Sequence, residues 1–405
     1  MVKTLLGFLA LLVPIGVVAA GPDVFVPSSS IALSSDKGVR AHTNFEIFTG
    51  THLVGGREDL LSQAIHGPLA IELPQSSVSG YGPVDIRNGY DVPPTGGSGA
   101  IAVIDAYDYP TSLNDFNVFS AQFGLPQESS GSATLTTNNV FEVAYQGATK
   151  PAGNASWNEE EALDIEWAHA MAPYAKIYLV EANSSSLSDL FAAVQKAVTL
   201  PGVREVSMSF GSSEFAQETS FDSTFVAPGV VFFAAAGDAS NSANYPATSP
   251  NVVGVGGTTL TLNGEDKLVS EVAWSDGGGG KSLYEKIPKY QAAIASIVGT
   301  SRGAPDIALN ADPGTGCAVY DSTPSDGFVG WQVFGGTSLA TPCCAGIANA
   351  SGRNYFSSNI ELTHIYSGLD LYFRDIVSGS SGNNSAKSGW DFCTGVGVPI
   401  RTLSL

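Results

Sequence analysis

The pattern that most constrains the fold of this chain is an alternation of short apolar runs with longer helical stretches, beginning near Tyr81. The apolar runs have the length of strands and occupy residues 100–105, 176–181, 205–210, 230–234 and 252–255. Continuous apolar runs predict strands that are buried on both faces. Helical stretches at 159–171 and 188–198 separate some of them. The sequence therefore predicts an α/β fold with a mostly parallel central sheet and helices on both faces.

Polar residues follow several of these strands, at the edge of a parallel sheet where ligand sites form. They are Asp105, Asp108, Ser209 and Asp238. We therefore expect the functional site at this edge.

Composition limits the partners. The formal net charge of the 405 residues is −20, and 43% of them are hydrophobic. Such an acidic chain is repelled by nucleic acid and by anionic membranes, so neither is an expected partner. Carboxylates take up protons in acid, which lowers self-repulsion there, so the charge also suggests function at acidic pH.

The first twenty residues are typical of a secretory signal peptide. Lys3 supplies the positive region, residues 5–17 the apolar core, and Ala20 the end of a small-residue cleavage site. The apolar run is short for a membrane span. We therefore expect a soluble, secreted, extracellular protein.

The four cysteines leave their state open. They are Cys317, Cys343, Cys344 and Cys393, and secretion permits either disulfides or buried thiols. A bond between the two adjacent cysteines would be strained, and no spacing typical of zinc sites occurs.

A serine in a glycine-rich turn is a candidate nucleophile. Ser338, in GGTSLATP at 335–342, follows the strand-like residues 331–334 and precedes a small-residue helix. At a helix N-terminus, free N–H groups and the helix dipole stabilise charge that develops on a carbonyl oxygen. The alternative is a helix-capping serine, since serine is favoured there in any case.

A serine nucleophile needs a base, and histidine is not favoured here. None of the five histidines lies in a glycine-rich turn, and His169 lies inside a predicted helix, where a buried structural role is expected. Glu160 and Asp164 lie four residues apart on that helix, on one face beside an apolar stripe, where two carboxyls can share a proton. Ser156 and Glu159 fit a capping box, and an acidic first turn is the alternative reading of the carboxyls.

Six motifs, in order between Tyr81 and Pro399, resemble the sedolisin family of serine-carboxyl peptidases. They are EEALDIEWAHAMAPYAKIYLVEA, SMSFG, AAAGD, YPATSPNVVGVGGTTL, PDIALNADPGTG and GGTSLATP. The resemblance implies a subtilisin-like fold and a monomeric endopeptidase that cleaves proteins or peptides in acid through an acyl-enzyme. It implies Ser338 as nucleophile, Glu160 as base, Asp164 as the partner that orients Glu160, and a protonated Asp238 as hydrogen-bond donor to the oxyanion.

The resemblance also implies one structural Ca²⁺. Its ligands would be two carboxylates and three backbone carbonyls, from Asp375, Ile376, Lys387, Gly389 and Asp391. From spacing alone, two solvated aspartates in a Ser/Gly loop would be the simpler reading.

The expected organisation is a signal peptide at 1–20, a short N-terminal segment at 21–77 in place of the long prodomain of family precursors, and a sedolisin-like peptidase domain at 78–405. Two other functions are compatible with the sequence. One is a catalytically inactive, secreted sedolisin-like binding protein. The other is a histidine-based, subtilisin-type peptidase, which requires an essential histidine.

Overall fold

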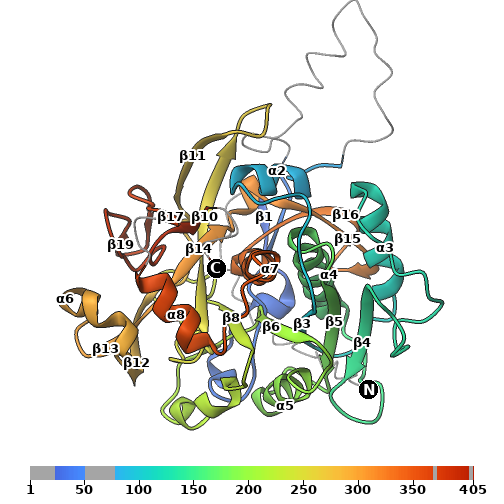
Figure 1. Cartoon of the computed structure of the whole chain (residues 1–405), viewed down its shortest axis with the longest axis horizontal. Helices are drawn as coiled ribbons and strands as arrows, with labels where there is room; N and C mark the ends of the chain where they lie inside the picture. Colours follow the sequence, from blue (N-terminus) through green and yellow to red (C-terminus); the bar gives the residue numbers. More distant parts are fainter. Residues whose placement is uncertain (1–22, 51–77, 368–371, 401–404) are drawn as a thin grey trace, which may run out of the picture.

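The structure, a computed structural model, describes residues 23–50, 78–367, 372–400 and Leu405 (Figure 1). The predicted signal peptide at 1–20 lies outside the described residues, as does 51–77. Within the described part, no helix is long and apolar enough to cross a membrane.

The central sheet has the order β11-β10-β8-β6-β3-β5-β4, and β14 also pairs with β10. All neighbouring strands are parallel except the β10–β11 pair. The predicted α/β fold with a mostly parallel sheet is thereby confirmed. The strands are β3 (Ala100–Ala106), β4 (Phe141–Tyr145), β5 (Lys176–Ala182), β6 (Val203–Met208), β8 (Val231–Ala235), β10 (Val253–Leu262), β11 (Leu268–Ala273) and β14 (Ile307–Asn310).

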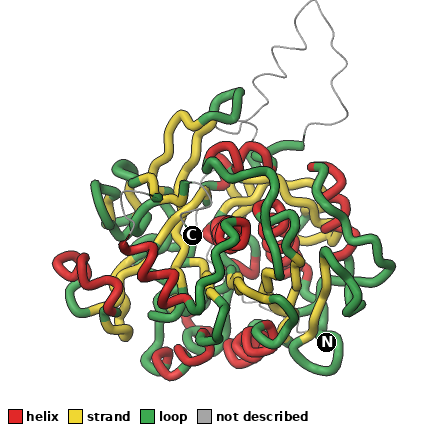
Figure 2. Tube along the Cα trace, in the orientation of Figure 1, coloured by secondary structure: helices red, strands yellow, loops and turns green. Residues whose placement is uncertain are grey.

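Side chains alternate between two cores across this sheet. Ile101 and Val103 of β3 belong to one core and Ala102 and Ile104 to the other, which is why the strand is apolar throughout. Helices α4 (Ala155–Met171) and α7 (Thr337–Ala350) pack on each other over one face, and α5 (Leu187–Ala197) covers the other (Figures 1 and 2). The other α-helices of the described residues are α2 (Pro83–Gly89), α3 (Ser112–Phe123), α6 (Ala295–Val298) and α8 (Ser358–Ser367).

Helix α4 begins one turn earlier than predicted and has a different cap. Asn154 is the N-cap residue, and its side-chain oxygen accepts a hydrogen bond from Trp157 N at 3.3 Å. The predicted capping box at Ser156 is therefore wrong. The Ser156 hydroxyl instead accepts a hydrogen bond from Ser29 N at 3.0 Å, a contact 127 residues away that local sequence cannot indicate.

Residues 24–48 belong to the same fold as the rest of the described chain. Strands β1 (Val24–Phe25), β2 (Glu46–Phe48), β16 (Phe328–Gly335) and β15 (Cys317–Ser325) form an antiparallel four-stranded sheet in that order. The strands of the smaller pairs are β7 (Ser212–Ser213), β9 (Asn244–Tyr245), β12 (Gly280–Lys286), β13 (Ser301–Ala304), β17 (Phe373–Arg374), β18 (Ser380–Ser381), β19 (Asn384–Ser385) and β20 (Val398–Pro399).

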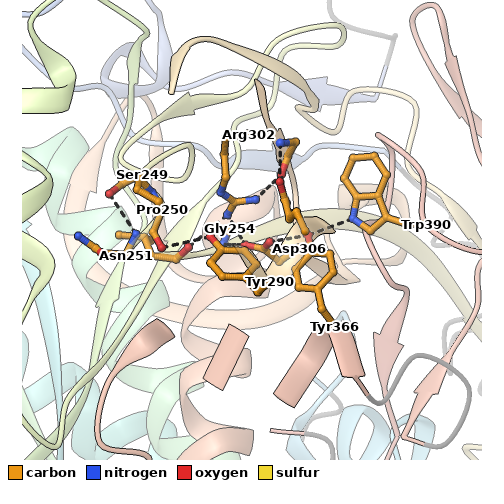
Figure 3. A network of polar contacts seen from close by, with 12 residues as sticks. Ser249, Pro250, Asn251, Gly254, Tyr290, Arg302, Asp306, Tyr366 and Trp390 are labelled. Atoms are coloured by element: carbon orange, nitrogen blue, oxygen red, sulfur yellow. Dashed lines mark hydrogen bonds and ion pairs between the residues drawn. The ribbon is translucent and has the colours of Figure 1, made fainter. Parts of the chain in front are cut away.

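A buried polar network ties the end of the sheet to the C-terminal loops (Figure 3). Arg302 and Asp306 form an ion pair with no exposed side-chain surface. Asp306 also accepts hydrogen bonds from Gly254 N and from the Tyr366 hydroxyl, both at 2.8 Å. Trp390 Nε1 donates to the same Tyr366 hydroxyl at 3.2 Å, so the loop that carries Asp391 is anchored to the core.

Candidate active site

Ser338 is the second residue of α7, so it lies at a helix N-terminus, as the sequence predicted. Its side chain is fully buried. Its hydroxyl donates to the carbonyl oxygen of Ser209 at 3.1 Å and accepts from Asn44 N at 3.0 Å. Its own N–H donates to the Asn44 carbonyl oxygen at 2.9 Å. Ser338 therefore lies in the position of a nucleophile, with a peptide group directly against it.

The turn before Ser338 is open to close approach because Gly336 has no side chain. Gly336 has φ of 104°, and a Cβ there would lie 2.6 Å from Asp238 Oδ2 and closer still to the Asn44 carbonyl oxygen. A carbonyl and a carboxyl thus face the same point, which only glycine permits.

Glu160 and Asp164 lie on α4, next to Ser338, and both are fully buried. Asp164 Oδ1 accepts from the Ser209 hydroxyl at 2.8 Å, whereas neither Glu160 oxygen has a hydrogen-bond partner among the described residues. Burial, and then Asp164 and Asp105, raise the pKa of Glu160 well above its usual range, although the Ser338 hydroxyl lowers it. Burial, and then Asp105, also raise the pKa of Asp164.

Asp105 completes this carboxyl cluster at the end of β3. Both its oxygens are buried without a partner in the described part of the chain, and burial raises its pKa to about 8. The sequence placed Asp105 at the functional edge of the sheet but gave it no role. The available signal was a single acid at the end of an otherwise apolar strand.

Asp238, which follows β8, faces the other side of the turn. Its Oδ1 accepts from Thr337 N at 2.8 Å and from the Thr337 hydroxyl at 2.7 Å. Its Oδ2 is buried and has no partner within the described residues. Burial, and then Glu46, raise the pKa of Asp238 well above its ordinary value. A proton on Oδ2 can therefore be donated to an oxygen near Gly336.

The two other strand-end residues have different surroundings. Ser209 belongs to the site, since its hydroxyl contacts Asp164 and its carbonyl oxygen accepts from Ser338. Asp108 forms an ion pair with Lys150 at 2.9 Å. Asp108 also lines a cavity of about 320 Å³ that none of the four predicted catalytic residues lines.

Among the described histidines, none contacts the Ser338 hydroxyl, whose partners are Ser209 and Asn44. His169 is fully buried, its Nε2 is 2.9 Å from the Pro126 carbonyl oxygen, and its ring packs against Phe116. Burial lowers the pKa of His169 to about 4. This is the structural role that its position in the helix suggested.

The loops expected to bind calcium do come together. Gly389 N donates to Asp375 Oδ2 and Lys387 N donates to Asp391 Oδ2, each at 2.9 Å. The carbonyl oxygens of Ile376, Lys387 and Gly389 accept no hydrogen bond from the described residues. Two carboxylates and three free carbonyls are the oxygen donors that Ca²⁺ prefers. In the described chain, no group of three or more His, Cys, Asp or Glu side chains could hold a metal, so carbonyls would have to contribute.

All four cysteines are buried free thiols. Burial raises the pKa of each thiol. Of the states left open by the sequence, the structure therefore has the buried thiols.

The fold, with a serine at the N-terminus of α7 beside buried carboxyls, defines the class of protein. A family model described as "Subtilase family" matches residues 126–358, more than half of the chain, so the chain is a subtilase. Its curated relatives include sedolisin of Pseudomonas sp. (strain 101), 26% identical over 82% of this chain, and kumamolisin of Bacillus sp. (strain MN-32), 30% identical over 84%. Within the subtilases, the chain belongs to the sedolisin family.

A solved structure shares the fold. Pseudomonas sedolisin, described as a serine-carboxyl proteinase complexed with two molecules of pseudo-iodotyrostatin, has a TM-score of 0.67 and 24% identity, over 80% of this chain and 96% of that one. The chain spans 62% of the length of the curated sedolisin and 66% of that of kumamolisin. Xanthomonalisin of Xanthomonas sp. (strain T-22) is 27% identical over 74% of this chain and 42% of its own length.

Proposed function

We propose that this chain is a secreted, serine-type endopeptidase that hydrolyses peptide bonds of proteins or peptides at acidic pH. One observation carries the proposal. Ser338 lies beside a buried pair of carboxyls, Glu160 and Asp164, and follows a turn at Gly336 that faces a third buried carboxyl, Asp238, whose Oδ2 has no partner among the described residues. A nucleophile, a base and an oxyanion donor are the three parts that acyl transfer requires.

In the proposed mechanism, Ser338 Oγ attacks the substrate carbonyl and Glu160 takes its proton. Asp164 keeps Glu160 in place and shares a proton with it, so the pair carries one charge rather than two. The Ser338 N–H and protonated Asp238 donate to the oxyanion. Glu160 returns the proton to the leaving amine, and water then hydrolyses the acyl-enzyme by the same route.

The expected pH dependence follows from the carboxyls. Asp238 donates only while it is protonated, so activity should be lost as pH rises through its raised pKa. At low pH the Glu160–Asp164 pair takes up a second proton and Glu160 can no longer accept the proton of Ser338, so this pair should set the acidic limit.

A digestion assay between pH 3 and pH 7 tests the proposal. Ser338→Ala and Glu160→Gln should each abolish cleavage of an added denatured protein. Glu159→Gln is a matched control, since Glu159 is an equally buried acid on the same helix but faces Asp321 and Ser325. Full activity of Ser338→Ala, or equal losses in the two Gln variants, would refute the proposed roles. A neutral optimum abolished by His169→Ala would favour the histidine-based alternative.

We also propose that Asp375, Asp391 and the carbonyl oxygens of Ile376, Lys387 and Gly389 hold one structural Ca²⁺. When bound, the ion would neutralise the carboxylates of Asp375 and Asp391 and tie together the two segments that carry them. Its contribution would be to stability rather than to chemistry.

Chelation should therefore lower the melting temperature of the Ser338→Ala protein, which cannot digest itself. Asp391→Ala also removes the acceptor of the Cys393 and Thr394 N–H groups. A lower melting temperature of this variant therefore does not by itself distinguish loss of the metal from loss of these hydrogen bonds. The decisive comparison is the further effect of chelator on Asp391→Ala, which should be small. An equal drop in both proteins, or no drop in the parent, would remove calcium from the proposal.

A further inference from the structure

A strand of the chain itself fills the catalytic centre. Residues 40–48 run through it as an extended segment. His42 and Gly211 exchange two backbone hydrogen bonds of 2.9 Å, and beyond the centre Glu46 and Ile47 pair with Gly335 and Phe334 of β16. Antiparallel pairing on both sides is how an extended peptide is held by main-chain hydrogen bonds.

The carbonyl group of Asn44 occupies the place of a reacting carbonyl. Its oxygen accepts from Ser338 N at 2.9 Å, and Asn44 N lies 3.0 Å from Ser338 Oγ. The same oxygen and the unpartnered Asp238 Oδ2 both face the point where Gly336 has no side chain. The nucleophile and both oxyanion donors therefore converge on one peptide group, the Asn44–Phe45 bond.

Both ends of the Asn44 side-chain amide form hydrogen bonds with the protein. Its Nδ2 donates to the Ser209 carbonyl oxygen at 2.7 Å, and its Oδ1 accepts from Asn244 Nδ2 at 3.1 Å. Asn44 is 1% exposed and Asn244 8%, so these bonds form in a closed pocket. A Cβ on Gly211 or Gly237 would lie 2.7 or 2.6 Å from atoms of Asn244, so both glycines leave space for this amide.

We infer that Asn44–Phe45 is a self-processing site and that the pocket around Asn244 selects asparagine on the acyl side of the bond that is cleaved. The inference rests on the proposed peptidase function. An aspartate at position 44 would place a carboxylate against the Ser209 carbonyl oxygen. A leucine would remove the acceptor of Asn244 Nδ2 and one of the two hydrogen bonds that the Ser209 carbonyl oxygen accepts.

The step is an ordinary peptide hydrolysis within one chain. Ser338 Oγ bonds to the Asn44 carbonyl carbon while its proton passes to Glu160. The carbon–nitrogen bond to Phe45 breaks, and Glu160 gives the proton to the Phe45 nitrogen. Water then hydrolyses the Asn44 ester, which leaves a carboxylate on Asn44, a free amine on Phe45 and an intact Ser338.

Intact mass and terminal-peptide analysis of the full chain test the first half. The wild type, shifted from pH 7 to pH 4, should yield a chain beginning at Phe45 and a fragment ending at Asn44, at a rate independent of protein concentration. Ser338→Ala should remain uncut. Asn44→Leu should slow the cut on the order of tenfold or more, because two buried hydrogen bonds are lost.

Peptides that differ only at the acyl-side residue test the second half. The processed enzyme should cleave the asparagine peptide on the order of tenfold or more faster in kcat/KM than the aspartate or leucine peptide. Asn244→Ala should remove that preference while it retains cleavage of the leucine peptide. Asn359→Ala, at an exposed position on α8, is the control and should behave as the wild type.

The outcomes separate this inference from the proposed function. Digestion of an added protein while the Asn44–Phe45 bond stays intact, or self-cleavage at another bond, would refute the inference and leave the peptidase standing. An unchanged preference for the asparagine peptide in Asn244→Ala would refute the role of the Asn244 pocket in selecting asparagine. A folded wild type that cleaves neither itself nor any substrate would refute both.

Discussion

Ser209 forms hydrogen bonds with three separate parts of the proposed site. Its hydroxyl donates to Asp164 on α4, and its carbonyl oxygen accepts from the Ser338 hydroxyl on α7 and from the Asn44 side chain. These three partners come from distant parts of the sequence. Its place after β6 explains this role, because the carboxyl end of a central parallel strand is reached from both covering helices.

At the same scale, substitutions of Asp238 should distinguish its role as a hydrogen-bond donor from the effect of its ionisation. Asp238→Ala removes the proposed donor, and loss of one oxyanion donor costs on the order of 10²–10³ in kcat. Asp238→Asn keeps an acceptor for Thr337 and gains a donor that does not ionise, so it should retain far more activity. Its loss of kcat with rising pH should also be shallower than in the wild type.

The measurement is a pH profile of kcat for the three proteins on one peptide. Parallel profiles for Asn and Asp at position 238 would mean that this carboxyl does not set the alkaline limit. An Asn variant as inactive as the Ala variant would mean that the amide cannot replace the proposed carboxyl donor.

The sequence could indicate Ser338, Glu160, Asp164 and Asp238 because each lies in a local pattern with a chemical meaning. The structure brings these four together. The sequence could not indicate Asn44, since nothing near residue 44 differs from an ordinary loop. The role proposed for Asn44 depends on its contact with Ser338, which lies 294 residues away in the sequence.

At the scale of elements, α4 shows where periodicity fails. An apolar stripe predicts one buried face, but the helix is buried almost throughout, with Glu159, Glu161 and Glu166 fully enclosed. Sequence patterns reveal a polar residue but not the neighbour that covers it. The central strands were predicted better, since continuous apolar runs in a parallel sheet have a single reading.

The cap of α4 offers a test. Asn154→Ala removes the acceptor for Trp157 N and should lower the free energy of unfolding by about 1 kcal/mol. Urea titration of the Ser338→Ala background measures the change. Ser188→Ala is a control, because this serine is exposed in the first turn of α5 and, among the described residues, its side chain bonds to the Ser186 hydroxyl alone. A loss at position 154 no larger than at position 188 would contradict the capping role.

At the scale of the whole molecule, the net charge of −20 hides how many acids are buried. Burial raises the pKa to about 8 for each of Asp105, Glu159, Glu181, Glu205 and Glu285. The unfolded chain would titrate these groups near pH 4. Between about pH 4 and pH 8 the folded chain therefore holds more protons than the unfolded chain, and its stability falls as pH rises.

We therefore expect the Ser338→Ala protein to melt at least about 5 °C lower at pH 7.5 than at pH 4.5, since a few kcal/mol shift Tm by several degrees. Glu205→Gln removes one titrating group and should make the dependence shallower. A melting temperature that rises toward neutrality would contradict the assignment of these acids as protonated in the folded state.

The pairing of residues 40–48 with the catalytic centre also bears on the order of events during synthesis. Ser338 lies 294 residues after Asn44, and α7 completes the site only when most of the chain has been made. Contacts so distant in sequence form late in folding. Since the strand that fills the centre is made first, a nascent chain has its cleft occupied as soon as the cleft exists, and no open peptidase need be present before folding is complete.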